Sequence, residues 1–303
     1  MLTIIILTFN EERHIARCLK AAREIAADIV VVDSLSTDAT VALAEQNGAR
    51  VLAHAFVNYA DQFQWALDHA DIRTPWVMRL DADEIIAPDL AAEIRARLPT
   101  LGPEVAGVNL KRKHIFMGRW LRHGGRYPLV LLRLWRHGQG RLENRWMDEH
   151  VVVRGGGLVT FQGGFADCNL NDLTFFTAKH NHYATREAID VLVRRHALLP
   201  VDAGVATQTS SGQARFRRWM KEKVYYRLPL WCGPSAYFLF RYVLQLGFLD
   251  GREGLIYHLL QGFWYRFLVG AKIEEFDRVL RACPDAASRL AALERLTGHR
   301  LRP

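Results

Sequence analysis

Cysteine is scarce in this sequence, and no signal-peptide pattern is present. The 4 cysteines are scattered and never form a CxxC pair, so the sequence indicates neither a disulfide framework nor a thiolate zinc site. The apolar start MLTIIIL has no basic region before it and no small-residue cleavage site, so it predicts a first strand rather than a leader. A reducing cytosol is the expected location.

Long apolar runs are also missing. The aromatic-rich segments 236–249 and 255–271 are each shorter than the about 20 residues that span a bilayer, and each contains an arginine. What is present is enough apolar material for a core, because 50% of the 303 residues are hydrophobic. The formal net charge of +8 and the pI near 9.5 indicate an anionic partner without identifying it.

The first hundred residues alternate between two apolar periods. Strand-like runs at 2–7, 29–32, 50–53 and 76–80 are separated by helical spacing at 15–26, 41–44 and 63–70. Repeated β–α–β order with continuously apolar strands predicts a parallel, doubly wound sheet covered by helices. Ligands of such sheets bind beyond the carboxyl ends of the strands.

Polar side chains follow three of the predicted strands. They are Thr8–Glu11, Asp33–Ser34 and Asp81–Glu84, and we expect the three strand ends to form one crevice. A simpler interpretation exists for two of them, since Asn10 can cap the next helix and the segment 36–38 can cap the helix near residue 39.

The triplet Asp81-Ala82-Asp83 predicts a metal site. If the strand continues, Asp81 and Asp83 leave on the same side and repel unless a cation lies between them. Carboxylate oxygens without thiolates favour Mg²⁺ or Mn²⁺, which keep open positions for phosphate oxygens. Glu84 would point the other way, and the sequence assigns it no purpose.

Several motifs resemble the family 2 glycosyltransferases of the GT-A fold. They are LTFNEE (7–12), VVDSLSTDAT (31–40) and LDADE (80–84). Later segments are similar to bacterial lipopolysaccharide-core glucosyltransferases, namely QFQWAL (62–67), KRKHIFMGRWLRHGG (111–125), MDEHV (147–151), KHNHYATREA (179–188) and GFLDGREGL (247–255). The resemblance extends over about residues 1–275. It implies a nucleotide-diphosphate-sugar donor, best represented by UDP-glucose, a divalent metal and inversion at the anomeric carbon.

The resemblance also implies roles for individual residues. Asp83 matches the direct metal ligand, and Asp81 matches a group nearer the ribose or a metal-bound water. The residues matched to nucleotide-sugar binding are Thr8, Asn10, Glu11, Asp33, Asp38 and Asp81. Gln62 and Gln64 either hydrogen-bond the donor or lie on a solvated helix face.

The catalytic base is expected in the segment Asp148-Glu149-His150, because an acceptor hydroxyl must lose its proton as it attacks. Only one of two consecutive side chains can reach the acceptor, and Glu149 is favoured over Asp148. An ion pair with a local arginine is the alternative role. His180 is the candidate third metal ligand, with His182 on the same side of an extended segment; a structural role for both, or His150 as the ligand, is the alternative.

Basic and aromatic residues are dense between residues 111 and 136. Guanidinium groups bind phosphate and aromatic faces stack on sugars or bases, so the stretch suits a phosphorylated sugar acceptor or nucleic acid. No RNP or KH signature is present, which favours the sugar and predicts no nucleic-acid partner. The set comprises Lys111, Arg112, Lys113, Arg119, Arg122, Arg126, Arg133 and Arg136, with Phe116, Trp120, Tyr127 and Trp135.

The C-terminal hundred residues predict a helical extension that associates with a membrane. Six basic residues between 215 and 227 lie beside aromatic residues, which is typical of a surface that binds anionic lipid. A pair of helices that only packs on a core is the alternative.

The whole sequence predicts three parts: a nucleotide-sugar-binding half (1–102), an acceptor-binding and catalytic half (103–204) and the helical extension (205–303). The predicted function is metal-dependent, inverting sugar transfer to a lipopolysaccharide-core or other cell-envelope glycan, at the cytoplasmic face of a bacterial inner membrane. The alternative is a non-catalytic basic protein that binds a membrane or nucleic acid.

Overall fold

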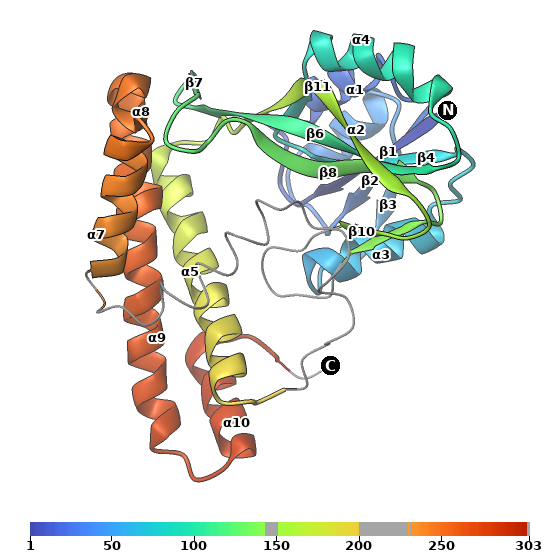
Figure 1. The fold of residues 1–303 in the computed structure, drawn as a ribbon. Helices are drawn as coiled ribbons and strands as arrows, with labels where there is room; N and C mark the ends of the chain where they lie inside the picture. The colour runs from blue at the N-terminus through green and yellow to red at the C-terminus, as the bar shows by residue number, and fades with distance from the viewer. Residues whose placement is uncertain (143–150, 200–229, 231, 302–303) are drawn as a thin grey trace. The chain divides into compact units, whose positions relative to one another are not determined.

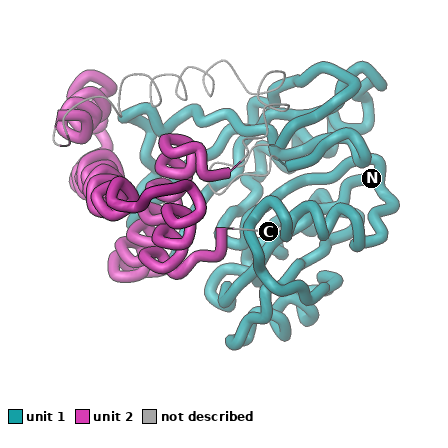
Figure 2. Tube along the Cα trace, turned by 90° about the horizontal axis from the view of Figure 1, so that it is seen from below, with its two compact units in different colours: residues 1–145, 149–170, 209–211 teal, residues 146–148, 171–208, 212–303 magenta. Residues whose placement is uncertain are grey.

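The computed structural model describes residues 1–142, 151–199, 230 and 232–301. These residues form two compact units, coloured separately in Figure 2. Unit 1 contains the described residues up to Leu170, and unit 2 contains those from Asn171 onward. The sheet of unit 1 includes strands from both sides of residue 102.

Unit 1 is built on a 9-stranded sheet with the order β3-β2-β1-β4-β8-β6-β11-β5, in which β7 pairs with β6 (Figure 1). A separate ribbon of two strands pairs β9 with β10. The strands are β1 Leu2–Thr8, β2 Asp28–Asp33, β3 Arg50–Ala53, β4 Trp76–Asp81, β5 Glu84–Ile86, β6 Val105–Phe116, β7 Arg119–Leu121, β8 Leu129–Arg136, β9 Gly140–Leu142, β10 Val151–Val153 and β11 Gly157–Cys168. The helices of this unit are α1 Ile15–Ala22, α2 Thr40–Gln46, α3 Tyr59–His69, α4 Pro88–Arg97 and the short 3₁₀ turn η1 Leu98–Thr100.

The prediction of parallel strands is correct for the first half of the sheet. The strands β3, β2, β1 and β4 pair in parallel, as their separation by helices requires. Beyond β4 the predicted parallel arrangement does not continue, because β8 pairs antiparallel with both β4 and β6, and β5 pairs antiparallel with β11. Only β6 and β11 are parallel in this half, so the sheet is mixed.

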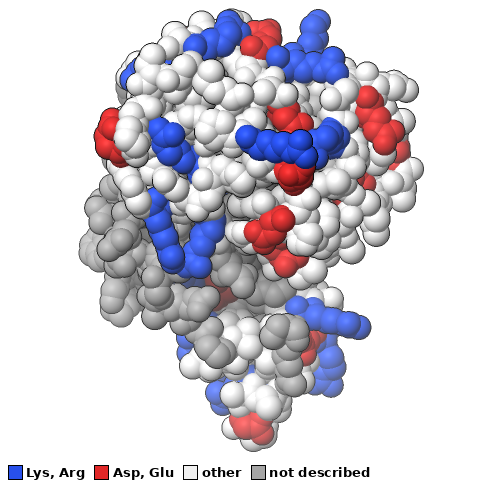
Figure 3. All heavy atoms as spheres, turned by 90° about the vertical axis from the view of Figure 1, so that its right-hand side faces the viewer, with Lys and Arg blue, Asp and Glu red and all other residues white. Residues whose placement is uncertain are grey.

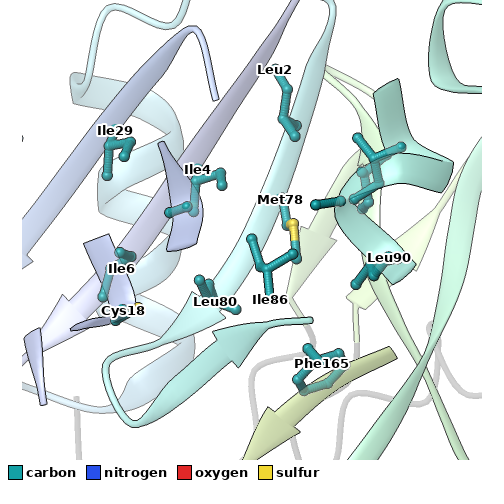
Figure 4. Close-up of a cluster of buried hydrophobic side chains, with 14 of the residues drawn as sticks. Leu2, Ile4, Ile6, Cys18, Ile29, Met78, Leu80, Ile86, Leu90 and Phe165 are labelled. Carbon is teal, nitrogen blue, oxygen red and sulfur yellow. The ribbon is translucent and has the colours of Figure 1, made fainter. Parts of the chain in front are cut away.

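Alternation along β1 separates two hydrophobic clusters on the two faces of the sheet. Ile4 and Ile6 are fully buried in one cluster, which also includes residues of α1 and α4 (Figure 4). Ile5 lies in the other, with Phe63 of α3 and Trp135 of β8. Burying a side chain of this size contributes about 1.5–3 kcal/mol. The packing on both faces therefore fixes β1, β2 and β4 and determines where their carboxyl ends lie.

Unit 2 is helical. The helices α5 and α9 pack along each other around Ala188, Leu192, Val269 and Leu280. Asp277 of α9 is 2% exposed and accepts from Arg195, His196 and Arg281. Burial opposes ionisation, but these donors hold the pKa of Asp277 below its usual value. The elements are α5 Leu173–Arg195, α7 Cys232–Leu239, the π-helix η3 Phe240–Leu244, η4 Gly247–Asp250, α8 Gly251–Tyr257, the π-helix η5 His258–Trp264, α9 Tyr265–Arg281 and α10 Ala286–Thr297.

Among the residues that the structure describes, no helix combines the length and apolar character needed to cross a bilayer.

Candidate active site

The loops after β1 and β2 are joined through Asp33, which is 2% exposed. Thr8 Oγ1 donates to Asp33 Oδ1 over 2.8 Å. Ser36 donates twice, from its backbone N to Oδ2 over 2.7 Å and from Oγ to Oδ1 over 2.6 Å. Both carboxylate oxygens of Asp33 therefore bind the protein itself, and this residue shapes the nucleotide loop that was predicted around it.

Asn10 continues the connection between the two loops. Its backbone N donates to Ser36 Oγ over 2.8 Å, and its Oδ1 accepts from the backbone N of Thr37 over 2.9 Å. Its φ of 55° is left-handed, a conformation that Asn adopts more readily than most residues. The capping alternative is wrong for Asn10, because the residue that precedes α1 is His14 and makes no side-chain cap.

Asp38 accepts hydrogen bonds from the start of α2 and from the loop after β1. Its Oδ1 accepts from the backbone N and the hydroxyl of Thr40, at the start of α2, over 3.0 and 2.5 Å. Its Oδ2 accepts from the backbone N of Glu12 over 3.2 Å. Burial would raise the pKa of Asp38, but these hydrogen bonds lower it.

Glu11 is held by a buried histidine. His14 Nδ1 lies 2.6 Å from Glu11 Oε2, and His14 Nε2 accepts from the backbone N of Leu170 over 2.9 Å. Because Nε2 accepts, the proton of a neutral His14 ring is on Nδ1 and is donated to Glu11. The carboxylate of Glu11 retains 22% of its side-chain exposure at the carboxyl end of the sheet.

Asp81 ends β4 and is surrounded by donors. Tyr59 OH donates to Oδ1 over 2.7 Å, and Arg133 Nη2 donates to Oδ2 over 3.2 Å. Arg79 Nε lies 3.6 Å from Oδ1. Burial opposes ionisation, but Arg133 and Arg79 hold the pKa of Asp81 well below its usual range. The side chain is 32% exposed, so the Asp81 carboxylate reaches the surface at the carboxyl end of β4.

Glu84, for which the sequence indicated no purpose, is the buried hydrogen-bond partner of Arg133. It is 1% exposed, its Oε1 accepts from Arg133 Nη2 over 2.7 Å, and its Oε2 accepts from the backbone N of Asp81 over 2.9 Å. Burial raises the pKa of Glu84 to about 8 against the attraction of Arg133, with the anions Asp81 and Asp167 adding to the rise. Glu84 thus fixes both the turn after β4 and the cation that faces Asp81.

The expectation that Asp81 and Asp83 leave one strand on the same side is wrong in its premise. The strand β4 ends at Asp81, the next two residues form a turn, and β5 begins at Glu84 and pairs with β11. Asp83 is half-buried in this turn, where its Oδ2 accepts from Asn169 Nδ2 over 2.9 Å and its carbonyl accepts from the backbone N of Cys168 over 3.0 Å.

The residues around this turn fit a hard cation held mainly by one carboxylate. Within the described part of the chain, no three His, Cys, Asp or Glu side chains gather into a metal-binding group. Mg²⁺ is commonly held by one or two carboxylates and completed by substrate phosphates and water, so a larger protein cage is not required. The hydrogen bond from Asn169 orients Asp83 in the way that ligating carboxylates are usually oriented.

Gln62 of α3 hydrogen-bonds the residues that follow β2 and β3. It is fully buried, its Nε2 donates to Ser34 Oγ over 3.1 Å and to the carbonyl of His54 over 3.0 Å, and its Oε1 lies 2.7 Å from His54 Nδ1. The solvated-face alternative is therefore wrong for Gln62. Gln64, two residues further along the helix, donates to Asp68 at the surface.

The residues expected to supply the base, Asp148, Glu149 and His150, lie outside the described residues. Their assignment stays a prediction. The strands on either side of segment 143–150 are described, and they pair at Leu142 and Val151.

His180 and His182 lie on the helix α5, so the expected extended segment is wrong. Two positions along a helix lie on different faces, so the two rings do not share a side. His180 Nδ1 lies 2.8 Å from the carbonyl of Phe176, which places the lone pair of a neutral ring on Nε2. His180 belongs to unit 2, and its role as a third metal ligand stays a prediction.

Several of the basic side chains that were predicted to bind a phosphorylated acceptor instead make contacts within unit 1. Arg136 donates to the carbonyls of Leu101, Gly102 and Val105. Arg133 is only 5% exposed. Arg122 stacks over Trp120 at 4.2 Å, and Trp120 meets Tyr127 edge-on at 5.0 Å, so an aromatic group does form beside the cations. Over the face in Figure 3, Lys and Arg are interspersed with Asp and Glu.

The fold and site define an α/β protein with carboxylates, hydroxyls and an amide at the carboxyl ends of three adjacent parallel strands. The chain matches the model of glycosyl transferase family 2 over residues 3–165, more than half of its length. It belongs to that family and is a glycosyltransferase. The match ends in β11, so the helical unit lies outside it.

Curated relatives are similar over different spans. The chain is 27% identical to the lipopolysaccharide core biosynthesis glycosyltransferase LpsC of Rhizobium meliloti over 303 residues, which cover 96% of this chain and 97% of LpsC. An uncharacterized glycosyltransferase of Rickettsia felis is 39% identical over 89 residues, which cover 29% of this chain and 31% of the relative. That second match spans less than a third of the length of the Rickettsia protein.

Similarity to solved structures is weaker. Glucosyl-3-phosphoglycerate synthase from Mycobacterium tuberculosis, in complex with Mn²⁺, UDP and phosphoglyceric acid, has a TM-score of 0.32 and 22% identity, covering 38% of this chain and 43% of that chain. TarS residues 1–349 of S. aureus, in complex with UDP-GlcNAc, has a TM-score of 0.47 and 12% identity, covering 99% and 93%. Scores this low establish neither a fold nor a ligand for this chain.

The two ends of β1 allow a matched test of the loop connection. Thr8→Val removes the donor to Asp33, and Thr3→Val removes the hydrogen bond between Thr3 and Thr74 at the opposite end of the strand, where Oγ1 atoms lie 2.7 Å apart. Both threonines are buried, so each change should lower the free energy of unfolding by about 1–3 kcal/mol. Only Thr8→Val should also weaken donor binding, measured by calorimetry. Equal donor affinity in both variants would contradict a role for the Thr8–Asp33 contact.

Proposed function

We propose that this glycosyltransferase binds a nucleotide-diphosphate sugar at the ends of β1, β2 and β4 and transfers the sugar with inversion, with the sheet unit acting as a GT-A domain. The observation that carries the proposal is the arrangement of two acids where β4 ends: Asp81, kept anionic by two arginines, and Asp83 in the turn that follows, oriented by Asn169. The loops tied together at Asp33 and Asn10 would receive the nucleoside part of the donor.

Divalent metal dependence is part of the proposal. Asp83 would hold Mn²⁺ or Mg²⁺, whose positive charge would offset the charge that develops on the leaving diphosphate. Asp81 already has Tyr59 and Arg133 as partners, which favours a role beside the ribose or a metal-bound water over direct ligation.

The chemical step is a direct displacement. The acceptor oxygen attacks the anomeric carbon, the bond from that carbon to the diphosphate oxygen breaks, and the acceptor proton moves to Glu149 or Asp148. We favour Glu149. A Glu149→Gln variant should bind donor normally and lose transfer, and if it transfers as fast as the parent the base is another residue.

The donor and acceptor are proposed from the family and from LpsC, the relative that matches along nearly the whole chain. UDP-glucose is the proposed donor. A lipopolysaccharide-core or related cell-envelope glycolipid, with or without phosphate on its sugars, is the proposed acceptor. Transfer would then take place at the cytoplasmic face of the inner membrane.

A donor screen tests the proposal without knowledge of the acceptor. The purified chain is mixed with UDP-, GDP- or dTDP-sugars, with Mn²⁺, Mg²⁺ or a chelator, and its unfolding temperature is recorded. A ligand that binds only the folded state at a hundred times its dissociation constant stabilises that state by about 2.7 kcal/mol. We expect UDP-glucose to raise the unfolding temperature only when metal is present. Stabilisation by another nucleotide, or equal stabilisation with chelator, would overturn the donor or the metal.

A further inference from the structure

Unit 2 exposes a cluster of apolar side chains at the end of a helical hairpin. The hairpin is formed by α7 and η3 on one side and by η4, α8 and η5 on the other (Figure 1). We call residues 239–249 the apolar tip. Its exposed side chains are Leu239, Phe240, Val243, Leu244, Leu246, Phe248 and Leu249, and Leu244 is 73% exposed. Contiguous exposure of large apolar side chains marks an interaction surface.

The charged groups of this segment point inward. Arg241 is 4% exposed and donates to Gln261 over 3.0 Å, and Asp250 is 2% exposed. His258, which packs against the tip, is fully buried. Every exposed residue from 239 to 249 is therefore Leu, Phe or Val. Insertion of this surface into an apolar medium would not require the removal of a hydrated charge from water.

The conformation of the apolar tip is fixed by its own packing. Leu246 has a left-handed φ of 58°, which ends η3 and turns the chain toward η4. A side chain at Gly247 would come within 2.7 Å of His258 Nε2, so the glycine permits close packing of the turn on η5. Tyr242 packs against Phe248 and His258, with ring centroids 6.3 and 6.1 Å apart.

The charges near the apolar tip in the sequence indicate what it binds. The sequence has no Asp or Glu between residues 223 and 249, and six Lys and Arg lie between 215 and 227. Arg252, just beyond the tip, is exposed. An apolar surface that follows a run of cations in the sequence complements an anionic lipid bilayer, whose headgroups carry negative charge above a hydrocarbon interior. A protein partner would more often require polar groups at the rim of the contact.

We propose that the apolar tip inserts into the interfacial layer of an anionic lipid bilayer and binds the enzyme to that surface. The proposal concerns a surface distinct from the donor site and does not depend on which sugar is transferred.

The test uses the full chain and two pairs of substitutions. The tip pair is Leu244→Ser with Phe248→Ser, and the control pair is Val279→Ser with Leu296→Ser, which are 41% and 43% exposed in the same unit. Co-sedimentation is measured with vesicles of phosphatidylglycerol and phosphatidylcholine, and with phosphatidylcholine alone. The tip pair should need roughly tenfold more lipid for half-maximal binding, because two apolar side chains no longer leave water. The control pair should bind as the parent does.

If the apolar tip binds something other than a lipid bilayer, the measurements should give different results. If the parent is a dimer and the tip pair is a monomer with unchanged vesicle binding, the tip is a contact between two copies and the proposal is wrong. Vesicle binding that is unchanged in the tip pair, or abolished entirely by high salt in the parent, also overturns insertion. Leu244→Ser alone provides the test if the pair lowers the unfolding temperature. Donor hydrolysis in solution should be unchanged in every variant, so failure here is distinguishable from failure of the proposed function.

Discussion

Replacing Asp83 by Asn should lower the rate of sugar transfer by about a thousandfold, the size of effect expected when a charge that stabilises the transition state is removed. The amide has nearly the same shape and can still contact Asn169, so the loss should come from the missing negative charge. The measurement is transfer or donor hydrolysis as a function of Mn²⁺ or Mg²⁺ concentration. The metal concentration that gives half-maximal activity should rise in parallel.

Asp68→Asn is the matched control. Asp68 is an exposed acid on α3 of the same unit, where it accepts from Gln64. The control should retain the activity and the metal dependence of the parent. If the Asp83 variant keeps full, metal-dependent transfer in purified form, the metal assignment is wrong. If both variants lose activity equally, the effect is one of overall charge and not of ligation.

The strand ends could be predicted from the sequence because their signal is local. Continuous apolar runs at β1, β2 and β4 predict buried strands, and the polar residues that follow them predict the crevice. The partners of those polar residues could not be predicted. Thr8 and Asp33 are 25 positions apart in the sequence, and only the parallel register of β1 and β2 brings them opposite each other.

Two errors have the same physical origin. The sequence at 76–86 does not reveal that β4 ends at Asp81, because the next residues are those of a new strand whose partner, β11, is far along the chain. The segment at 179–188 was predicted to be extended, but it belongs to the helix α5. This helix packs on α9, which begins about 70 residues after α5 ends and is not visible in the local pattern.

Arg133 is the clearest example of a residue whose role could not be predicted from the sequence. In the sequence it is one of many cations in a basic stretch, yet in the structure it is buried between Asp81 and Glu84 and over the ring of Phe165. Arg133→Met should lower the free energy of unfolding of unit 1 by about 3–5 kcal/mol, because it leaves buried acid without its cation. Hydrogen exchange of β8 amides would report on this unit separately from unit 2.

The stability that Arg133→Met loses should be larger at alkaline than at acidic pH. The pKa of Glu84 is raised to about 8 by burial, above its unfolded value, so its contribution to stability is complete below the unfolded pKa and is lost as the pH rises through 8. Without Arg133 the anion is less favourable still, so the Arg133→Met variant should lose more stability at alkaline than at acidic pH. In the double variant Arg133→Met with Glu84→Gln, most of this pH dependence should disappear and part of the stability should return.

Arg136→Met is the control on the same strand, because Arg136 donates to backbone carbonyls and not to acids. The stability lost in Arg136→Met should be independent of pH over the same range. If Arg133→Met costs less than about 1 kcal/mol, or if the double variant is no more stable than the single one, the Arg133–Glu84 pair is not a coupled buried ion pair. If the pair is confirmed, donor affinity should fall in Arg133→Met even where the chain remains folded, because Asp81 loses one of the two arginines that favour its ionised form, and the one that donates to it.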